Sequence, residues 1–322
     1  MNPLRLPFFE ALDPARHVLV AGAGGGFDVF SGLPLYFALA ETGKTVSLAN
    51  LTFSNLPPGS AGRQLAPALV EVTADSEGSQ TYFPEKHLSQ WFRDRGKEVP
   101  VYCFHRVGPR PVAEAYRVLA DHLGFDTVIL VDGGTDSLMR GDEEGLGTPV
   151  EDMTSIAAAD ALDDAKVPRK LLACLGFGID TFHGVCHAHV LEAVAELARA
   201  GGYLGAFSLT PEMQAVRLFV EATEYVLART ESRPSIVLTS ILSALEGRFG
   251  DYHPTDRTAG SELFINPLMA MYWCFRLAPV ARRVLYLDLI RALEGFVETQ
   301  FRIERFRAES QAGRRPWRSL PM

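Results

Sequence analysis

The chain has 322 residues, of which 47% are hydrophobic and 22% are charged. These proportions are typical of globular proteins, and they exclude collagen-like and intrinsically disordered chains. The formal net charge is -8, and an acidic protein as a whole repels the phosphates of a nucleic acid. We therefore expect no nucleic-acid partner.

The sequence predicts a cytoplasmic protein that has no membrane partner. No segment reaches the ~18 consecutive apolar residues that a membrane span requires, and residues 1–12 lack the apolar run of a secretory signal. The four cysteines are Cys103, Cys174, Cys186 and Cys274, and none forms a C-x-x-C pair. We therefore expect reduced, buried thiols and no disulfide framework.

Apolar runs and helical spacing alternate along the first two thirds of the chain. Strands are predicted at residues 17–21, 45–51, 99–104, 127–131 and 170–175, and helices at 29–40, 85–93, 112–123 and 192–200. Such alternation indicates a parallel sheet with helices on both faces. The predicted fold class is α/β: a Rossmann-like, doubly wound, mostly parallel sheet with a helical C-terminal extension.

We expect residues 1–208 to form this α/β core and residues 209–322 a mainly helical part packed on it, within one continuous domain. Thr210 can cap a helix that starts at Pro211. Residues 284–306 have the spacing of one helical face, which either packs on the sheet or forms a homo-oligomer interface. The basic tail, residues 314–318, is expected to be a solvated terminus.

Residues 55–80 are rich in turn residues and are predicted to form a long loop. The loop is either a lid over a site or a variable surface excursion. Two further polar or glycine-rich loops, residues 201–205 and 248–257, are also candidates for closing a site.

A glycine loop follows the first predicted strand. Its candidate ligand-binding residues are Gly22, Gly24, Gly25 and Gly26. Glycines expose backbone N–H groups, and a following helix amino terminus favours an anion. A dinucleotide site would also need a carboxylate after the second strand, but residues 48–51 contain none, and Asp28 in the loop would repel a pyrophosphate.

The segment after the strand at 127–131 carries most of the polar residues that could perform chemistry. Asp132 and Asp136 are candidate catalytic residues; the candidate ligand-binding residues are Gly133, Gly134, Thr135, Ser137, Asp142 and Glu143. Asp132 should emerge at the carboxyl edge of the sheet, and its loop can present N–H and hydroxyl groups to an anion. This loop resembles the phosphoribosyl-binding loop of phosphoribosyltransferases, with Gly133 in place of that family's second acidic residue.

Asp180 follows a third predicted strand. In a parallel sheet Asp28, Asp132, Asp136 and Asp180 all lie on loops at the same edge. Carboxylates brought together there would raise one another's pKa values or bind a divalent cation such as Mg²⁺. The alternative is that each is a local cap or turn residue.

His183, Cys186, His187 and His189 form a second polar cluster. If this segment is helical, His183 and His187 share one face, as a zinc or iron site would require. The other interpretations are a catalytic His183 near Asp180, or a histidine at a helix start. We treat His183 as a candidate catalytic residue and leave the metal unassigned.

Several of these motifs together resemble the family catalogued as domain of unknown function 1152. The likeness is carried by residues 20–35, residues 132–152, residues 201–212, and Tyr82, Pro84 and Glu85. It spans roughly residues 17–280. The resemblance implies one continuous α/β unit and implies neither an activity nor catalytic residues.

The leading functional hypothesis is an enzyme that acts on a small polar metabolite, nucleotide-, nucleoside- or sugar-like. The loop aspartates would perform hydrolase, lyase or transferase chemistry at the carboxyl edge of the strands. The first alternative is a non-catalytic protein that binds or senses a nucleotide or metabolite. The second is an NAD(P)-dependent oxidoreductase.

Overall fold

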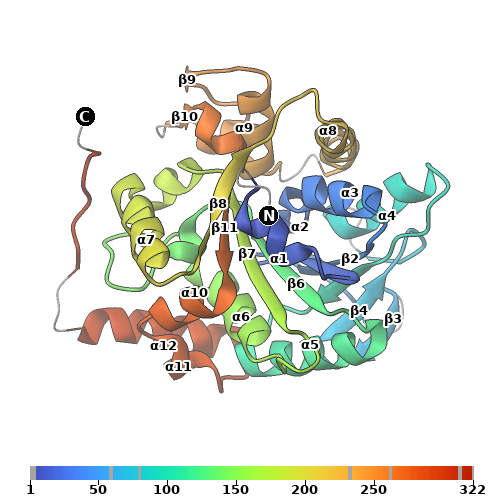
Figure 1. Ribbon diagram of the computed structural model, residues 1–322, viewed down its shortest axis with the longest axis horizontal. Helices are drawn as coiled ribbons and strands as arrows, with labels where there is room; N and C mark the ends of the chain where they lie inside the picture. The colour runs from blue at the N-terminus through green and yellow to red at the C-terminus, as the bar shows by residue number, and fades with distance from the viewer. Residues whose placement is uncertain are drawn as a thin grey trace.

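The computed structural model describes residues 5–57, 61–78, 81–230, 234–260, 263–310 and 314–320. Its centre is a nine-stranded mixed sheet (Figure 1). In spatial order the strands are β3 (Arg63–Ala66), β4 (Leu69–Val72), β5 (Val101–Phe104), β2 (Thr45–Leu51), β1 (His17–Gly22), β6 (Thr127–Asp132), β7 (Arg169–Leu175), β11 (Met271–Arg276) and β8 (Tyr203–Ser208). Strands β5, β2, β1, β6 and β7 are parallel to one another. Strand β4 runs antiparallel to both of its neighbours, β3 and β5, and β11 runs antiparallel to both β7 and β8.

The central strands are continuous apolar runs because both of their faces are covered. Within β1, Val18 and Val20 belong to one hydrophobic core, and Leu19 and Ala21 belong to the other. Successive side chains of a strand point to opposite faces, so each strand supplies both cores.

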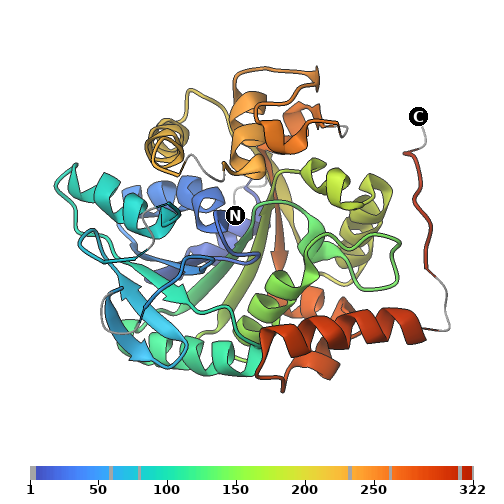
Figure 2. The same ribbon diagram turned by 180° about the vertical axis from the view of Figure 1, so that it is seen from behind.

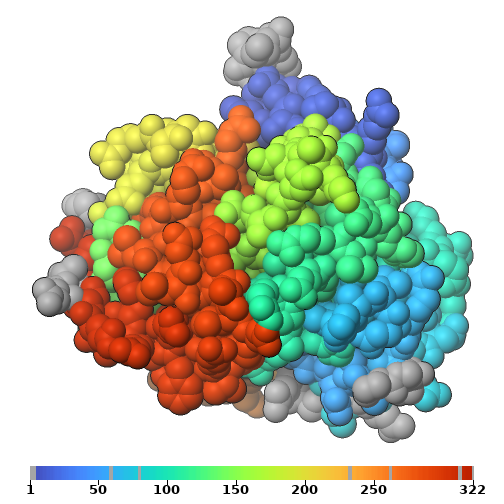
Figure 3. All heavy atoms as spheres, turned by 90° about the horizontal axis from the view of Figure 1, so that it is seen from below, coloured from blue at the N-terminus to red at the C-terminus, as the bar shows by residue number. Residues whose placement is uncertain are grey.

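Helices cover the two faces as separate layers (Figures 1 and 2). The first layer contains α1 (Pro7–Leu12), α2 (Asp28–Ser31), α3 (Leu33–Glu41), α4 (Pro84–Arg93), α8 (Gln214–Leu227) and α9 (Ile236–Leu245). The second contains α5 (Pro109–Leu123), α6 (Pro149–Asp160), α7 (His187–Arg199), α10 (Leu277–Arg283), α11 (Leu287–Ile290) and α12 (Phe296–Glu309). Seen from below, the surface is formed largely by the C-terminal helices (orange to red) and the segment containing α5 beside them (Figure 3).

The predicted fold class is confirmed: the sheet is mostly parallel at its centre, helices lie on both faces, and the C-terminal region is mainly helical. The division at residue 208 stays a prediction. Residues beyond it also supply β11, which pairs with β7 and β8 inside the sheet. Among the helices of the described residues, none combines the length and apolar character needed to cross a bilayer.

Residues 55–80 are more ordered than the sequence predicts. They contain the β3–β4 hairpin, and β4 pairs with β5 and extends the sheet. Residues 58–60 and 79–80 of this segment lie outside the described residues. Each strand has four residues and stands between turn residues, so the apolar run is too short to distinguish a strand from a loop.

Two C-terminal expectations are wrong in detail. Helix α8 begins at Gln214 with Met213 as its N-cap, not at Pro211. Residues 284–306 form two helices, α11 and α12, because residues 291–295 interrupt them. Val297 and Phe301 on α12 are exposed, and a homo-oligomer at this face stays a prediction.

The basic tail is held against the protein, contrary to the expectation of a solvated terminus. The Arg315 guanidinium forms ion pairs with Asp142 at 2.8 Å, with Glu143 at 2.7 Å and with Glu192. The backbone N–H of Trp317 also donates to a Glu144 carboxylate oxygen at 2.8 Å. Long-range charge pairs of this kind leave no local pattern in the sequence.

Candidate functional site

A cavity of about 320 Å³ lies at the carboxyl edge of the parallel strands. Strand β1 lies between β2 and β6, so the chain leaves β1 toward one side of the sheet and later returns on the other. Open α/β sheets bind ligands where the strand order reverses in this way. The cavity is lined by the glycine loop after β1, the segment after β6, the segment after β7 and the start of α9.

Asp28 begins α2, directly after the glycine loop. Its Oδ2 accepts a hydrogen bond from the Gly24 backbone N–H at 2.6 Å. A Cβ atom at position 24 would lie 2.7 Å from Asp28 Oδ2 and 2.9 Å from an oxygen of Asp152, so this close approach requires glycine. The N–H that would meet a ligand phosphate in a dinucleotide-binding loop is thus paired with a carboxylate of the protein itself.

Asp132 is the last residue of β6, and Asp136 begins a short 3₁₀ turn four residues later. Asp132 Oδ2 accepts hydrogen bonds from Ser137, from the backbone N–H at 3.2 Å and from Oγ at 2.5 Å. Asp136 Oδ2 accepts from the Thr148 backbone N–H at 2.8 Å and from Thr148 Oγ1 at 3.1 Å. Both carboxylates are therefore positioned by loop residues, and both line the cavity.

Asp180 lies in the 3₁₀ turn Ile179–His183 that follows β7. Its Oδ2 accepts a hydrogen bond from the Thr135 backbone N–H at 2.7 Å. This bond links the segment after β7 to the segment after β6. The structure therefore brings Asp28, Asp132, Asp136 and Asp180 to one cavity.

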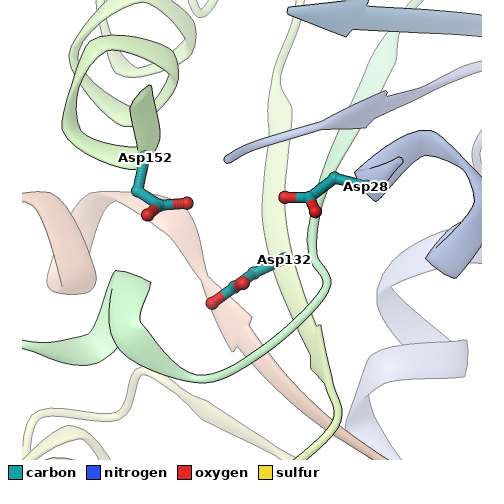
Figure 4. A group of neighbouring side chains, drawn as sticks. All are labelled: Asp28, Asp132 and Asp152. Atoms are coloured by element: carbon teal, nitrogen blue, oxygen red, sulfur yellow. The ribbon is translucent and has the colours of Figure 1, made fainter. Parts of the chain in front are cut away.

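Asp152 is a site residue that the sequence analysis did not assign. It lies in the first turn of α6, is only 1% exposed, and points toward Asp28 and Asp132 (Figure 4). One oxygen from each of these three carboxylates lies within 4.8 Å of the others. A signal was present, because Glu151 and Asp152 follow Thr148-Pro149, a pair typical of a helix start. The sequence could not show that this helix begins at the cavity.

Burial and mutual repulsion shape the electrostatics of the cavity. Burial, with a contribution from Asp136, raises the pKa of Asp132 to about 7. Burial and then neighbouring carboxylates raise the pKa values of Asp28, Asp152 and Asp180 well above the ordinary range. Burial also raises the pKa of Asp136. Two ionised carboxylates about 5 Å apart repel by roughly 3 to 4 kcal/mol at an effective dielectric constant near 20.

Few cationic side chains face these carboxylates. Among the described lining residues, the basic side chains are His183 and Arg257, and both are exposed. Partial burial lowers the pKa of His183, while the Asp136 charge opposes that shift. Arg106 does not line the cavity and forms an ion pair with Glu151 at 3.1 Å. The cavity therefore carries an excess of acidic groups.

The remaining predicted residues fall into two sets. Gly24, Gly25, Gly26 and Gly133 line the cavity, whereas Gly22, Gly134, Thr135 and Ser137 do not. Thr135 and Ser137 instead hold Asp180 and Asp132 in place, and Gly134 packs against Asp180. Gly134, Thr135 and Ser137 therefore support the carboxylates without lining the cavity.

The structure does not bring Asp142 and Glu143 to the cavity. They pair with Arg315, and Glu143 also accepts hydrogen bonds from the backbone N–H groups of Arg140 and Gly141. Their carboxylates contact the chain terminus instead, and a ligand-binding role for them stays a prediction. Acidic residues in a glycine-rich loop look alike in sequence whichever role they have.

His183 and His187 do not lie on one helix, so the condition for a shared helical face is not met. His183 ends the 3₁₀ turn, and α7 begins at His187. Gly184, with φ of 85°, separates them. His183 lines the cavity, whereas the ring of His187 stacks on Phe177.

Of the two loops expected to close a site, one contributes and one does not. Arg257, from residues 248–257, lines the cavity together with Ser235, Ile236 and Val237 at the start of α9. Residues 203–205 belong to β8 and are absent from the lining. Helix α9 contributes because it lies above the carboxyl edge of the sheet (Figure 1).

Glu85 is linked to the glycine loop through Asn50. It is fully buried, and its carboxylate accepts hydrogen bonds from Asn50 Nδ2 at 2.9 Å and from Ser54 Oγ at 3.0 Å. The same Asn50 amide donates to the Gly26 carbonyl at 2.7 Å. This network fixes the position of the loop that carries Asp28.

The Glu85 carboxyl should make stability depend on pH. Burial raises its pKa above the ordinary value of 4.5, so folding favours the protonated form. Its contribution is therefore full below pH 4.5 and is lost as pH rises through the folded-state pKa. The free energy of unfolding of the wild type minus that of Glu85→Gln should fall between pH 4 and pH 8. Urea titrations in EDTA check this, and a difference that rises with pH would contradict it.

The family comparison covers most of the chain but begins after the glycine loop. The model of the family described as "Protein of unknown function (DUF1152)" matches residues 62–308. The chain belongs to this family. The matched region contains Asp132, Asp136, Asp152 and Asp180, and it begins after Asp28. A comparison with curated proteins and solved structures finds no match.

Proposed function

We propose that this protein is an enzyme that acts on a small polar metabolite, nucleotide-, nucleoside- or sugar-like, by hydrolase, lyase or transferase chemistry. The observation that carries the proposal is the meeting of five aspartates in one cavity at the point where the strand order reverses. Buried carboxylates with raised pKa values can transfer protons near neutral pH or bind a cation.

A second group of lining residues suits an anionic part of the substrate. The amino terminus of α9, at Ile236 and Val237, lines the cavity beside Arg257. A helix amino terminus carries a partial positive charge, and a guanidinium binds carboxylate or phosphate oxygens. We therefore propose a substrate with a polar or cation-bound end on the aspartates and an anionic group near α9.

An NAD(P)-dependent oxidoreductase fits the site less well. The Gly24 backbone N–H, which would bind a pyrophosphate oxygen in such an enzyme, already donates a hydrogen bond to Asp28. A dinucleotide site also needs a ribose-binding carboxylate at the end of β2. Asn50 stands there instead, and its amide already donates hydrogen bonds to Gly26 and Glu85. Neither NAD nor NADP should raise the melting temperature of the protein.

We also propose a cytoplasmic location and a small-molecule partner. All four cysteines are buried free thiols, as is usual in a reducing compartment. The cavity volume of about 320 Å³ lies within the range of small-molecule sites.

A substrate panel tests the proposal. The purified protein, with Mg²⁺ or Mn²⁺ and with EDTA, would be incubated with nucleotides, nucleosides and sugar phosphates and analysed by mass spectrometry. We expect at least one compound to be consumed in a protein-dependent manner. A compound that raises the melting temperature and is never consumed would instead support the non-catalytic binding or sensory alternative.

A further inference from the structure

Asp152 places a buried carboxyl group at the wall of the cavity. Neither of its oxygens has a hydrogen-bond partner within the described residues, and the residue is 1% exposed. Buried charged groups in proteins are paired or bind metal ions. Figure 4 shows the carboxylate directed at Asp28 and Asp132.

The spacing of the three carboxylates matches the size of a divalent cation. One oxygen from each lies within 4.8 Å of the other two. Oxygen ligands surround Mg²⁺ at about 2.1 Å and Ca²⁺ at about 2.3 to 2.6 Å, so ligands of one ion lie no more than about 5 Å apart. The three side chains come from separate elements, α2, β6 and α6, which the packed sheet holds in place.

The donor atoms select the kind of cation. This group contains only carboxylate oxygens, without imidazole or thiolate, and such ligands suit Mg²⁺, Mn²⁺ or Ca²⁺ rather than zinc or copper. We propose that Asp28, Asp132 and Asp152 bind one hard divalent cation of the Mg²⁺ or Mn²⁺ type. The use of that cation in turnover rests on the proposed function, but its binding does not.

Two glycines next to Asp28 allow its carboxylate to lie at this position. Gly24 and Gly133 pack against Asp28, where a Cβ atom would lie 2.7 Å and 2.8 Å from its two oxygens. Three carboxylates fill part of the coordination sphere, and water or substrate oxygens would complete it. Asp136, Asp180 and His183 line the same cavity outside the three-carboxylate group and remain available for proton transfer.

A binding measurement without substrate tests the cation site. The full-length protein would be treated with EDTA, desalted and titrated with MnCl₂ at pH 7.5, following free Mn²⁺ by electron paramagnetic resonance. We expect one tight site per chain, competition by Mg²⁺, and a melting temperature that rises with cation concentration. Asp152→Asn should weaken Mn²⁺ binding on the order of 100-fold or more, beyond the effect typical of outer-shell changes.

Two further variants distinguish coordination by the three carboxylates from attraction of Mn²⁺ by the negative charge of the cavity as a whole. Asp180→Asn removes a cavity carboxylate outside the group and should weaken binding by less than about tenfold. Gly24→Ala keeps all three carboxylates but displaces Asp28 and Asp152, so it should weaken binding as Asp152→Asn does. Circular dichroism and melting curves establish that each variant folds.

The possible results bear separately on the two proposals. Absence of a tight Mn²⁺ site in the wild type, or equal affinity in the wild type and a folded Asp152→Asn variant, overturns the cation site. Tight binding that Asp152→Asn and Gly24→Ala abolish supports it, whether or not the metabolite panel yields a substrate. If the protein has no tight Mn²⁺ site and its turnover is insensitive to EDTA, the enzymatic function is supported and the cation site is refuted.

Discussion

Replacing Asp132 by asparagine should lower turnover by on the order of 100-fold or more while the protein remains folded. The residue ends the central strand β6, lines the cavity, and is one of the three carboxylates of the proposed cation site. Asparagine keeps a side-chain oxygen that can accept the hydrogen bonds from Ser137. The fold should therefore tolerate the change, while the charge is lost.

Initial rates on the compound found by the panel, with melting curves in parallel, measure this effect. Asp121→Asn is a matched control, because Asp121 is exposed and its ion pair with Lys166 contributes little. Its turnover should equal that of the wild type. Full activity of a folded Asp132→Asn variant would remove Asp132 from the chemistry.

Replacing Arg315 by methionine should lower the free energy of unfolding by about 3 kcal/mol. Arg315 is mostly buried and pairs with Asp142 and with Glu143, whose side chain is fully buried. Removing the guanidinium leaves that buried carboxylate without its cationic partner, and only the backbone N–H groups of Arg140 and Gly141 still donate to it among the hydrogen bonds described above. The cost of an unpaired buried charge is much larger than the cost of losing an exposed pair.

Guanidinium chloride titrations of three variants test this assignment. Arg305→Met removes an exposed pair with Glu309 one helical turn away and should cost about 0.5 kcal/mol or less. Glu143→Gln combined with Arg315→Met should recover about 1 kcal/mol or more relative to Arg315→Met alone, because the buried charge is gone. Equal losses for Arg315→Met and Arg305→Met would show that the tail contributes no stability.

These two positions differ in how far the sequence could predict them. Asp132 follows a continuous apolar run, and such a run indicates a buried strand without information about its neighbours. The end of a parallel strand then places Asp132 at the edge where ligands bind. Arg315 pairs with residues 172 and 173 positions away, and local patterns contain no information about such contacts.

The sequence by itself determined the parallel strands at the centre of the sheet and the edge at which Asp28, Asp132, Asp136 and Asp180 emerge, because burial on both faces produces long apolar runs. The tertiary structure alone decided that α6 begins beside those strands, which brings Asp152 to Asp28 and Asp132. It also decided that Asp142 and Glu143 hold the tail, and that β11 and β8 complete the sheet. These features depend on contacts between distant segments, whose energies are set by packing and charge pairing and not by local residue preference.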